Sequence, residues 1–168
     1  NQFRKAFKLP AGGVLRARCY VSGLGYAISF VNGIQLGDPD TILGPAVQFQ
    51  HRLPYQVYDC AALLRAGGDN TWATTLGRGW YSLPEDGFTH GLGYKTIGAR
   101  SLRVLITMQL QVDGEVRTVR IGSDASWKHA AGSIQFDHLF LGEVHDARAE
   151  TVGWQESGFD DSSWSNAS

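Results

Sequence analysis

Asp38 and Asp40 are two carboxylates whose spacing could support metal chemistry, because they form an Asp-X-Asp pair directly after a predicted hairpin turn. They lie near the start of the stretch 37–53, which shows no strand pattern and is predicted to be an irregular loop. Calcium takes about six to eight oxygen ligands, and loop carboxylates together with backbone carbonyls supply them. A sugar diol can complete such a shell, so a calcium-assisted sugar site is one interpretation. Turn formation by Asp-Pro-Asp in a solvated loop is the other.

Trp80 and Tyr81 follow Gly77 and Gly79 at the end of a predicted strand, in the sequence Gly-Arg-Gly-Trp-Tyr. An aromatic face can stack on the apolar C–H face of a pyranose ring while the sugar hydroxyls remain hydrogen-bonded. Trp80 could equally close one end of the core, and both interpretations stay open. For Tyr81 the sequence favours exposure. Both residues are therefore candidates for sugar binding.

Glu85, Asp86 and His90 belong to a second irregular stretch, 77–99, that could fold beside Asp38. Their side chains could bind sugar hydroxyls or supply oxygen ligands, whereas the alternative is a polar loop without any ligand. Loops of this length inside a compact domain are usually functional or mobile. The expected sugar-binding residues are therefore Asp38, Trp80, Tyr81, Glu85, Asp86 and His90, and the expected metal ligands are Asp38 and Asp40.

Glu143, His145, Asp146 and Arg148 could perform general acid–base chemistry, and paired carboxylates about 5–10 Å apart hydrolyse glycosides. On a strand predicted at 143–150, however, Glu143 and His145 share one face while Asp146 and Arg148 share the other. A structural Asp146–Arg148 ion pair is therefore favoured, and a hydrolase is the least favoured reading. No catalytic residue is predicted, since the chain has no G-x-S-x-G motif and no histidine pair at zinc-site spacing.

The composition, with 43% hydrophobic and 18% charged residues and a net charge of −1, is typical of a soluble globular protein. It disfavours nucleic acid or an anionic membrane as a partner, and no apolar run approaches the roughly 18 residues of a membrane span. Arginines such as Arg4, Arg18 and Arg103 are scattered along predicted strands, where solvated edges explain them. Cys19 and Cys60 occupy apolar positions, so buried free thiols are favoured over a disulfide.

Alternation of apolar and polar residues with a period of two dominates the sequence and predicts an all-β fold. The longest predicted strand, 102–112, turns at Asp113-Gly114, and the strand 26–30 turns at Asn32-Gly33, as type I′ hairpins do. Other strands are expected at 3–9, 15–21, 55–59, 71–76, 115–121, 134–140 and 143–150, with one helical turn at 60–66. About ten short strands predict one antiparallel β-sandwich or jelly roll over residues 1–168.

Eight segments, in order along the chain, resemble the N-terminal β-sandwich module of bacterial and fungal α-L-rhamnosidases, which is related to the rhamnose-binding family 67 carbohydrate-binding modules. The segments are 3–7, 15–38, 55–70, 77–81, 112–114, 123–128, 142–148 and 159–164. Single pieces such as FDDSSW recur in many galactose-binding-like sandwiches, so the ordered set carries the resemblance. One departure is Pro-Ala-Val-Gln-Phe at 45–49, where the family commonly has Gly-Trp-Thr-Asp-Tyr after the proline.

The resemblance implies a galactose-binding-like jelly roll with an accessory role, because the family's hydrolytic carboxylates lie on a separate helical barrel. It also implies recognition of L-rhamnose or rhamnose-containing glycans assisted by calcium, and a catalytic domain as a partner in a larger protein. We therefore expect a non-catalytic carbohydrate-binding module, and an extracellular one. A structural domain that packs on a catalytic barrel without binding sugar is the alternative.

Overall fold

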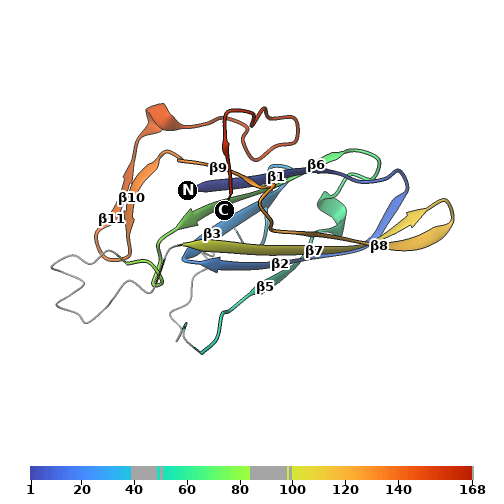
Figure 1. The fold of residues 1–168 in the computed structure, drawn as a ribbon, viewed down its shortest axis with the longest axis horizontal. Coiled ribbons are helices and arrows are strands. Elements are labelled where there is room, and N and C mark those ends of the chain that lie inside the picture. The colour runs from blue at the N-terminus through green and yellow to red at the C-terminus, as the bar shows by residue number, and fades with distance from the viewer. Residues whose placement is uncertain (39–48, 50, 84–97, 99, 168) are drawn as a thin grey trace.

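Two antiparallel sheets pack face to face in the computed structural model, which describes residues 1–38, 49, 51–83, 98 and 100–167 (Figure 1). In this described part, the strand orders are β12-β9-β1-β6-β3-β4 and β5-β2-β7-β8, while β10 and β11 form a separate hairpin. The six-stranded sheet contains β1 (Gln2–Lys8), β3 (Tyr26–Val31), β4 (Ile34–Gln35), β6 (Asp69–Gly77), β9 (Lys128–Ala130) and β12 (Ser165–Asn166). The four-stranded sheet contains β2 (Gly13–Leu24), β5 (Gln56–Asp59), β7 (Ser101–Val112) and β8 (Glu115–Gly122), and the hairpin contains β10 (Ile134–His138) and β11 (Gly142–His145). The prediction of an all-β antiparallel sandwich is confirmed.

The core lies between the two sheets because each strand turns alternate side chains inward. On β7, Val104, Ile106 and Met108 are at most 4% exposed, while the residues between them are half-buried or exposed. From the facing sheet, Trp72 of β6 enters the same core and has no exposed surface. Burial of one such side chain contributes about 1.5–3 kcal/mol. The alternation predicted for 102–112 therefore corresponds to the contact that holds the layers together.

Two hairpins have the turns that the sequence predicts. Asn32 and Gly33 connect β3 to β4 with φ angles of 51° and 83°, and Asp113 and Gly114 connect β7 to β8 with 52° and 82°. Positive φ at both central residues defines the type I′ turn. The Asn32 side chain also accepts the backbone N–H of Thr71 at 2.8 Å, which joins the first turn to β6.

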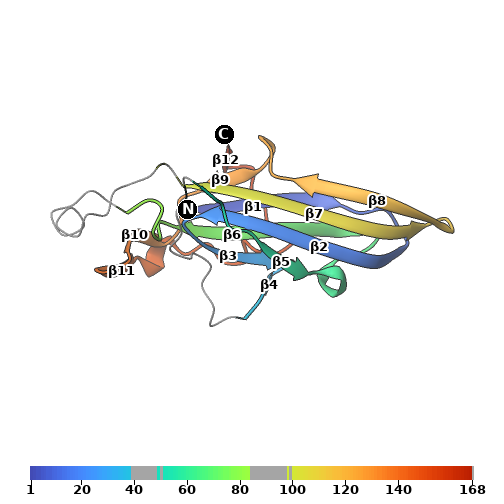
Figure 2. The ribbon, with the colours of Figure 1, turned by 90° about the horizontal axis from the view of Figure 1, so that it is seen from below.

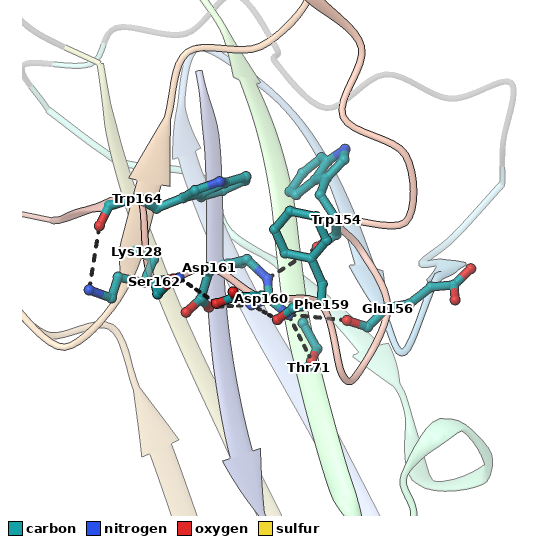
Figure 3. A network of polar contacts seen from close by, with 10 residues as sticks. Thr71, Lys128, Trp154, Glu156, Phe159, Asp160, Asp161, Ser162 and Trp164 are labelled. Carbon is teal, nitrogen blue, oxygen red and sulfur yellow. Dashed lines mark hydrogen bonds and ion pairs between the residues drawn. The ribbon is translucent and has the colours of Figure 1, made fainter.

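A C-terminal segment, residues 154–164, crosses the outer face of the six-stranded sheet (Figures 1 and 3). Trp154 is 4% exposed, and its ring packs against Phe30 of β3 at 6.3 Å and against Trp164 at 5.9 Å between centroids. Because this segment covers the outer face, β6 is buried on both sides from Asn70 to Thr74. The segment therefore forms a third layer over part of the sandwich.

Arg4 of β1 holds this segment from inside the molecule. Its side chain is 1% exposed and donates hydrogen bonds to the backbone carbonyls of Trp154, Glu156 and Phe159 at 3.1–3.2 Å, within the network of Figure 3. The same guanidinium forms an ion pair with the carboxylate of Asp161. A buried guanidinium needs a counter-charge and partners for its N–H groups, and the segment supplies both. The expectation that Arg4 lies at a solvated strand edge is wrong, because the C-terminal segment covers it.

Cys19 and Cys60 form a disulfide, so the expectation of free thiols is wrong. Cys19 lies on β2 and Cys60 directly follows β5, and the pairing of these two strands brings the Cα atoms to 6.4 Å. Both cysteines have no exposed surface, as the alternation predicted. The residues next to each cysteine are enough to predict its burial. The disulfide, in contrast, depends on the pairing of β2 with β5, which are distant in the sequence.

Two predicted elements are shorter in the structure. The helical turn expected at 60–66 is a 3₁₀ turn, η1 (Ala61–Leu63), and the strand expected at 143–150 divides into β11 and a second 3₁₀ turn, η2 (Ala147–Ala149). The strand ends because the Asp146 side chain accepts the backbone N–H of Arg148 at 3.0 Å, a local bond that replaces strand pairing. Within the described residues, no helix has the length and apolar character required to cross a membrane.

Candidate functional site

Trp80 and Tyr81 lie on the turn that follows β6, and both side chains are half-buried. Gly79 allows this turn to approach the connection between β2 and β3. It has a φ of 52°, and a Cβ atom at this position would lie 3.0 Å from the backbone carbonyl carbon of Gly25. Any side chain at Gly79 would push the turn outward. The Gly-Arg-Gly-Trp-Tyr sequence therefore fixes the two aromatic residues at the end of β6.

Other aromatic rings support these two residues from the side. Trp80 meets Phe140 at 5.7 Å between centroids with an interplanar angle of 84°, and Tyr81 meets Phe49 at 5.0 Å and 79°. Edge-to-face contacts of this kind are favourable and restrict ring rotation. Trp80 is thus neither enclosed in the core nor fully exposed, and Tyr81 shows only part of the exposure that the sequence favoured.

Asp137 of β10 anchors the hairpin that carries Phe140. Its carboxylate accepts the backbone N–H of Arg78 at 2.5 Å and lies 3.6 Å from the guanidinium of Arg100. The Arg78 guanidinium also lies over the ring of Phe136, 5.8 Å from its centroid. One carboxylate, 22% exposed, therefore binds groups from both sides of the loop that contains Trp80.

His138 completes the same hairpin and has a structural role. It is 5% exposed, and its Nδ1 atom accepts the backbone N–H groups of Phe140 and Leu141 at 3.1 and 3.2 Å. Its ring stacks on Phe136 at 6.0 Å with an interplanar angle of 6°. The two hydrogen bonds commit this nitrogen to the turn as an acceptor.

The predicted polar site residues are described only in part. Asp38 is exposed and follows β4, and its neighbour Gly37 packs against Tyr58 of β5, where an added Cβ would lie 2.8 Å from the ring. These contacts place Asp38 beside β5 and Trp80 beside the hairpin β10–β11. The remaining predicted residues lie outside the described part of the chain: Asp40, Glu85, Asp86 and His90.

A metal site has no support from the residues that can be examined. Among the described residues, no group of three or more His, Cys, Asp or Glu side chains could hold an ion. The predicted ligand Asp40 is not among these residues, and neither are Glu85 and Asp86. Calcium binding through Asp38 and Asp40 therefore stays a prediction.

The predicted ion pair between Asp146 and Arg148 is confirmed. The Arg148 guanidinium donates to both carboxylate oxygens, from Nε at 2.9 Å and from Nη2 at 2.8 Å. Beside it, His145 lies 3.2 Å from the carboxylate of Glu150 at the surface. The Asp146 carboxylate thus caps η2 at the protein surface, with Arg148 bound to it.

Replacing Arg148 with alanine should raise the pKa of Asp146 toward its ordinary value. The hydrogen bonds from the Arg148 side chain and then from its backbone N–H lower this pKa, and only the first is lost in the variant. Because the pKa is lowered in the folded protein, the stabilisation by this carboxylate is present above its ordinary pKa and is lost as the pH falls through the lowered value. Carboxyl-carbon NMR titration measures the pKa of Asp146 in the native protein and in the variant. Asp160, whose pKa is lowered by hydrogen bonds from Ser162, is the internal control and should not change.

The β-sandwich and its ordered segments define the family. Residues 12–168 match the family model described as the α-L-rhamnosidase N-terminal domain, and the chain belongs to this family. The resemblance found in the sequence is confirmed.

Particular relatives are α-L-rhamnosidases of bacteria and fungi. The chain is 35% identical over 165 residues to the enzyme of Streptomyces avermitilis, covering 98% of this chain and 15% of the enzyme, and 33% identical over 156 residues to that of Formosa agariphila, covering 88% and 15%. The crystal structure of the S. avermitilis enzyme complexed with L-rhamnose matches with a TM-score of 0.86 and 30% identity over 98% of this chain and 15% of that one. The crystal structure of the native Aspergillus terreus enzyme matches with a TM-score of 0.82 and 32% identity, covering 98% of this chain and 18% of that one. The chain thus spans about 15% of the length of these two curated relatives.

Proposed function

We propose that this domain is a non-catalytic carbohydrate-binding module that recognises L-rhamnose or rhamnose-containing glycans through the turn at Trp80. The observation that carries the proposal is the position of Trp80, half-buried on the turn after β6 with Phe140 packed edge-to-face against its ring. A fixed aromatic ring binds the C–H face of a pyranose without losing much side-chain freedom. The S. avermitilis relative was crystallised with L-rhamnose, which supports the choice of sugar.

Polar groups would then orient the sugar on this ring. We assign this part to Asp38, Tyr81, Glu85, Asp86 and His90, whose oxygen and nitrogen atoms can bind sugar hydroxyls. Asp38 and Asp40 would supply carboxylate oxygens to a calcium ion, and the sugar hydroxyls would complete the coordination shell. The relatives' names suggest that a rhamnosidase catalytic domain acts beside this module.

Isothermal titration with L-rhamnose tests this function. We expect measurable binding at millimolar sugar, about tenfold weaker binding by Trp80→Ala, and partial retention by Trp80→Phe, since the loss of one stacking contact corresponds to about 1.4 kcal/mol. A chelator should abolish binding if calcium completes the site. Binding that survives chelation would reject the calcium ion but not the module. No heat with a fully folded protein would reject the module.

The second candidate is a structural accessory domain that packs on a catalytic domain and binds no sugar. The hairpin β10–β11 favours it, because Phe140, Leu141 and Val144 are 42%, 57% and 56% exposed on one small element. Exposed apolar groups that lie together often mark an interface. Folded protein that fails to bind L-rhamnose, with or without calcium, would favour this role.

We also propose that the protein works outside the reducing cytosol. The disulfide between Cys19 and Cys60 supports this location, because such bonds persist in oxidising compartments. Thiol labelling of denatured protein from its native source should find both cysteines blocked. Two labelled thiols would contradict the proposed location.

A further inference from the structure

The outer face of the four-stranded sheet, which is turned toward the viewer in Figure 2, carries a second group of aromatic residues. The strand register places Tyr20 of β2 beside Leu105 of β7 and Val57 of β5. The rings of Tyr20 and Tyr55 lie 6.2 Å apart with an interplanar angle of 47°, and Tyr55 is 65% exposed. A hollow of about 300 Å³ lies against these residues. This volume and this surface suit one sugar ring.

The same face has a positive charge balance. On β2, Arg16 lies opposite Gln109 of β7, and Arg18 lies opposite Thr107 of β7. Arg120 of β8 lies on the other side of Thr107, and Arg103 of β7 lies opposite Ser22 of β2. All four arginines are exposed. The one carboxylate at the outward register positions of these described strands is Asp59, which lies opposite Arg18. A ligand that carries negative charge is therefore favoured on this face.

A second hollow adjoins the first at the end of the strands. It measures about 290 Å³, and its lining includes Phe3, Trp127 and His129 together with the charged residues Arg100 and Asp124. Arg103 and Ser123 line both hollows. The Ser123 hydroxyl accepts the backbone N–H of Val104 at 3.2 Å, which fixes its position between them. The two hollows share this part of their lining and are together called the groove, with Arg103 between them.

We propose that this groove binds an acidic oligosaccharide in two adjoining subsites. One pyranose ring stacks on Tyr20 and Tyr55, the next enters the hollow beside Phe3 and His129, and Arg103 donates hydrogen bonds to a uronate carboxylate between them. Asp124 makes the second subsite mixed in charge, so the carboxylate belongs at Arg103. The inference extends the proposed glycan-binding function, but it does not use Trp80 or Tyr81. Arg100 lines the second hollow and also pairs with Asp137 near the Trp80 turn, so it is left unchanged in the test.

Titration of the full chain with tetragalacturonate and with its methyl ester tests the groove. The ester keeps the stacking faces and adds only one methyl group to each residue, but it carries no charge, so the native protein should bind it about tenfold more weakly than the acid. Tyr55→Ala and Arg103→Gln should each weaken binding of the acid about tenfold. Arg103→Gln should have no effect on the ester. Arg117→Gln, which removes an exposed arginine of β8 paired with Glu115, should leave both unchanged.

The outcomes separate this proposal from the proposed function. If L-rhamnose binds and the uronate does not, the groove is rejected and the Trp80 site stands. If Trp80→Ala weakens uronate binding as much as Tyr55→Ala does, one site serves both ligands and the groove is also rejected. If Arg117→Gln weakens uronate binding as much as Arg103→Gln does, the uronate is attracted by the overall charge of the protein, and the groove is rejected. Uronate binding that depends on Tyr55 and Arg103, without any L-rhamnose binding, would support the groove and reject the Trp80 site.

Discussion

Replacing Arg4 with methionine is expected to lower the free energy of unfolding by about 3–5 kcal/mol, because it removes a buried guanidinium that pairs with the partly exposed carboxylate of Asp161. The variant also leaves the carbonyls of Trp154, Glu156 and Phe159 without the donors that they have in the native protein. A buried acceptor that loses its partner costs further stability. Urea unfolding followed by tryptophan fluorescence measures the loss, since Trp154 and Trp164 report on the same segment.

The matched control is Arg117→Met. Arg117 pairs with Glu115 in an exposed contact, with side chains 54% and 74% exposed, and such pairs contribute less than about 1 kcal/mol. Should Arg4→Met not fold, Asp161→Asn tests the same pair. It keeps the hydrogen bonds from Arg4 to the three carbonyls but removes the counter-charge of a buried guanidinium, so it should also lower the free energy of unfolding. Limited proteolysis should then cleave residues 154–164 first. Equal stability of the Arg4 and Arg117 variants would contradict the proposed role of Arg4.

The parts of the fold that the sequence predicted are those that depend on neighbouring residues. Alternation from Leu102 to Val112 identifies the buried face of β7, and Asn32-Gly33 identifies a hairpin turn from two residues alone. The layer formed by residues 154–164 could not be predicted in this way. Arg4 binds it chiefly through backbone carbonyls, and a carbonyl has the same chemistry in every residue.

The candidate site divides along the same line. Gly77 and Gly79 mark the turn that presents Trp80, and both glycines are visible in the sequence. The support from Phe140 depends on the docking of the hairpin β10–β11, in which Asp137 binds Arg78 across 59 residues. In the sequence, the only sign of the contact between Asp137 and Arg78 is that Asp137, a charged residue, lies inside the strand predicted at 134–140. The arginines on the outer face of the four-stranded sheet are scattered in the sequence, and only the strand register brings them onto one face.

Replacing Cys19 and Cys60 together with alanine is expected to lower the free energy of unfolding by about 2–4 kcal/mol. The disulfide joins residues 41 positions apart, and in the chain-entropy account it restricts the unfolded chain more than a short loop would. Alanine is the matched replacement because both positions have no exposed surface and a serine hydroxyl would be buried. Urea unfolding should give a lower midpoint for the reduced native protein and for the double variant than for the oxidised native protein. Because the disulfide is buried, reduction should be slow in the native state and fast in urea. If reductant present during unfolding does not change the urea midpoint of the native protein, Cys19 and Cys60 are not linked.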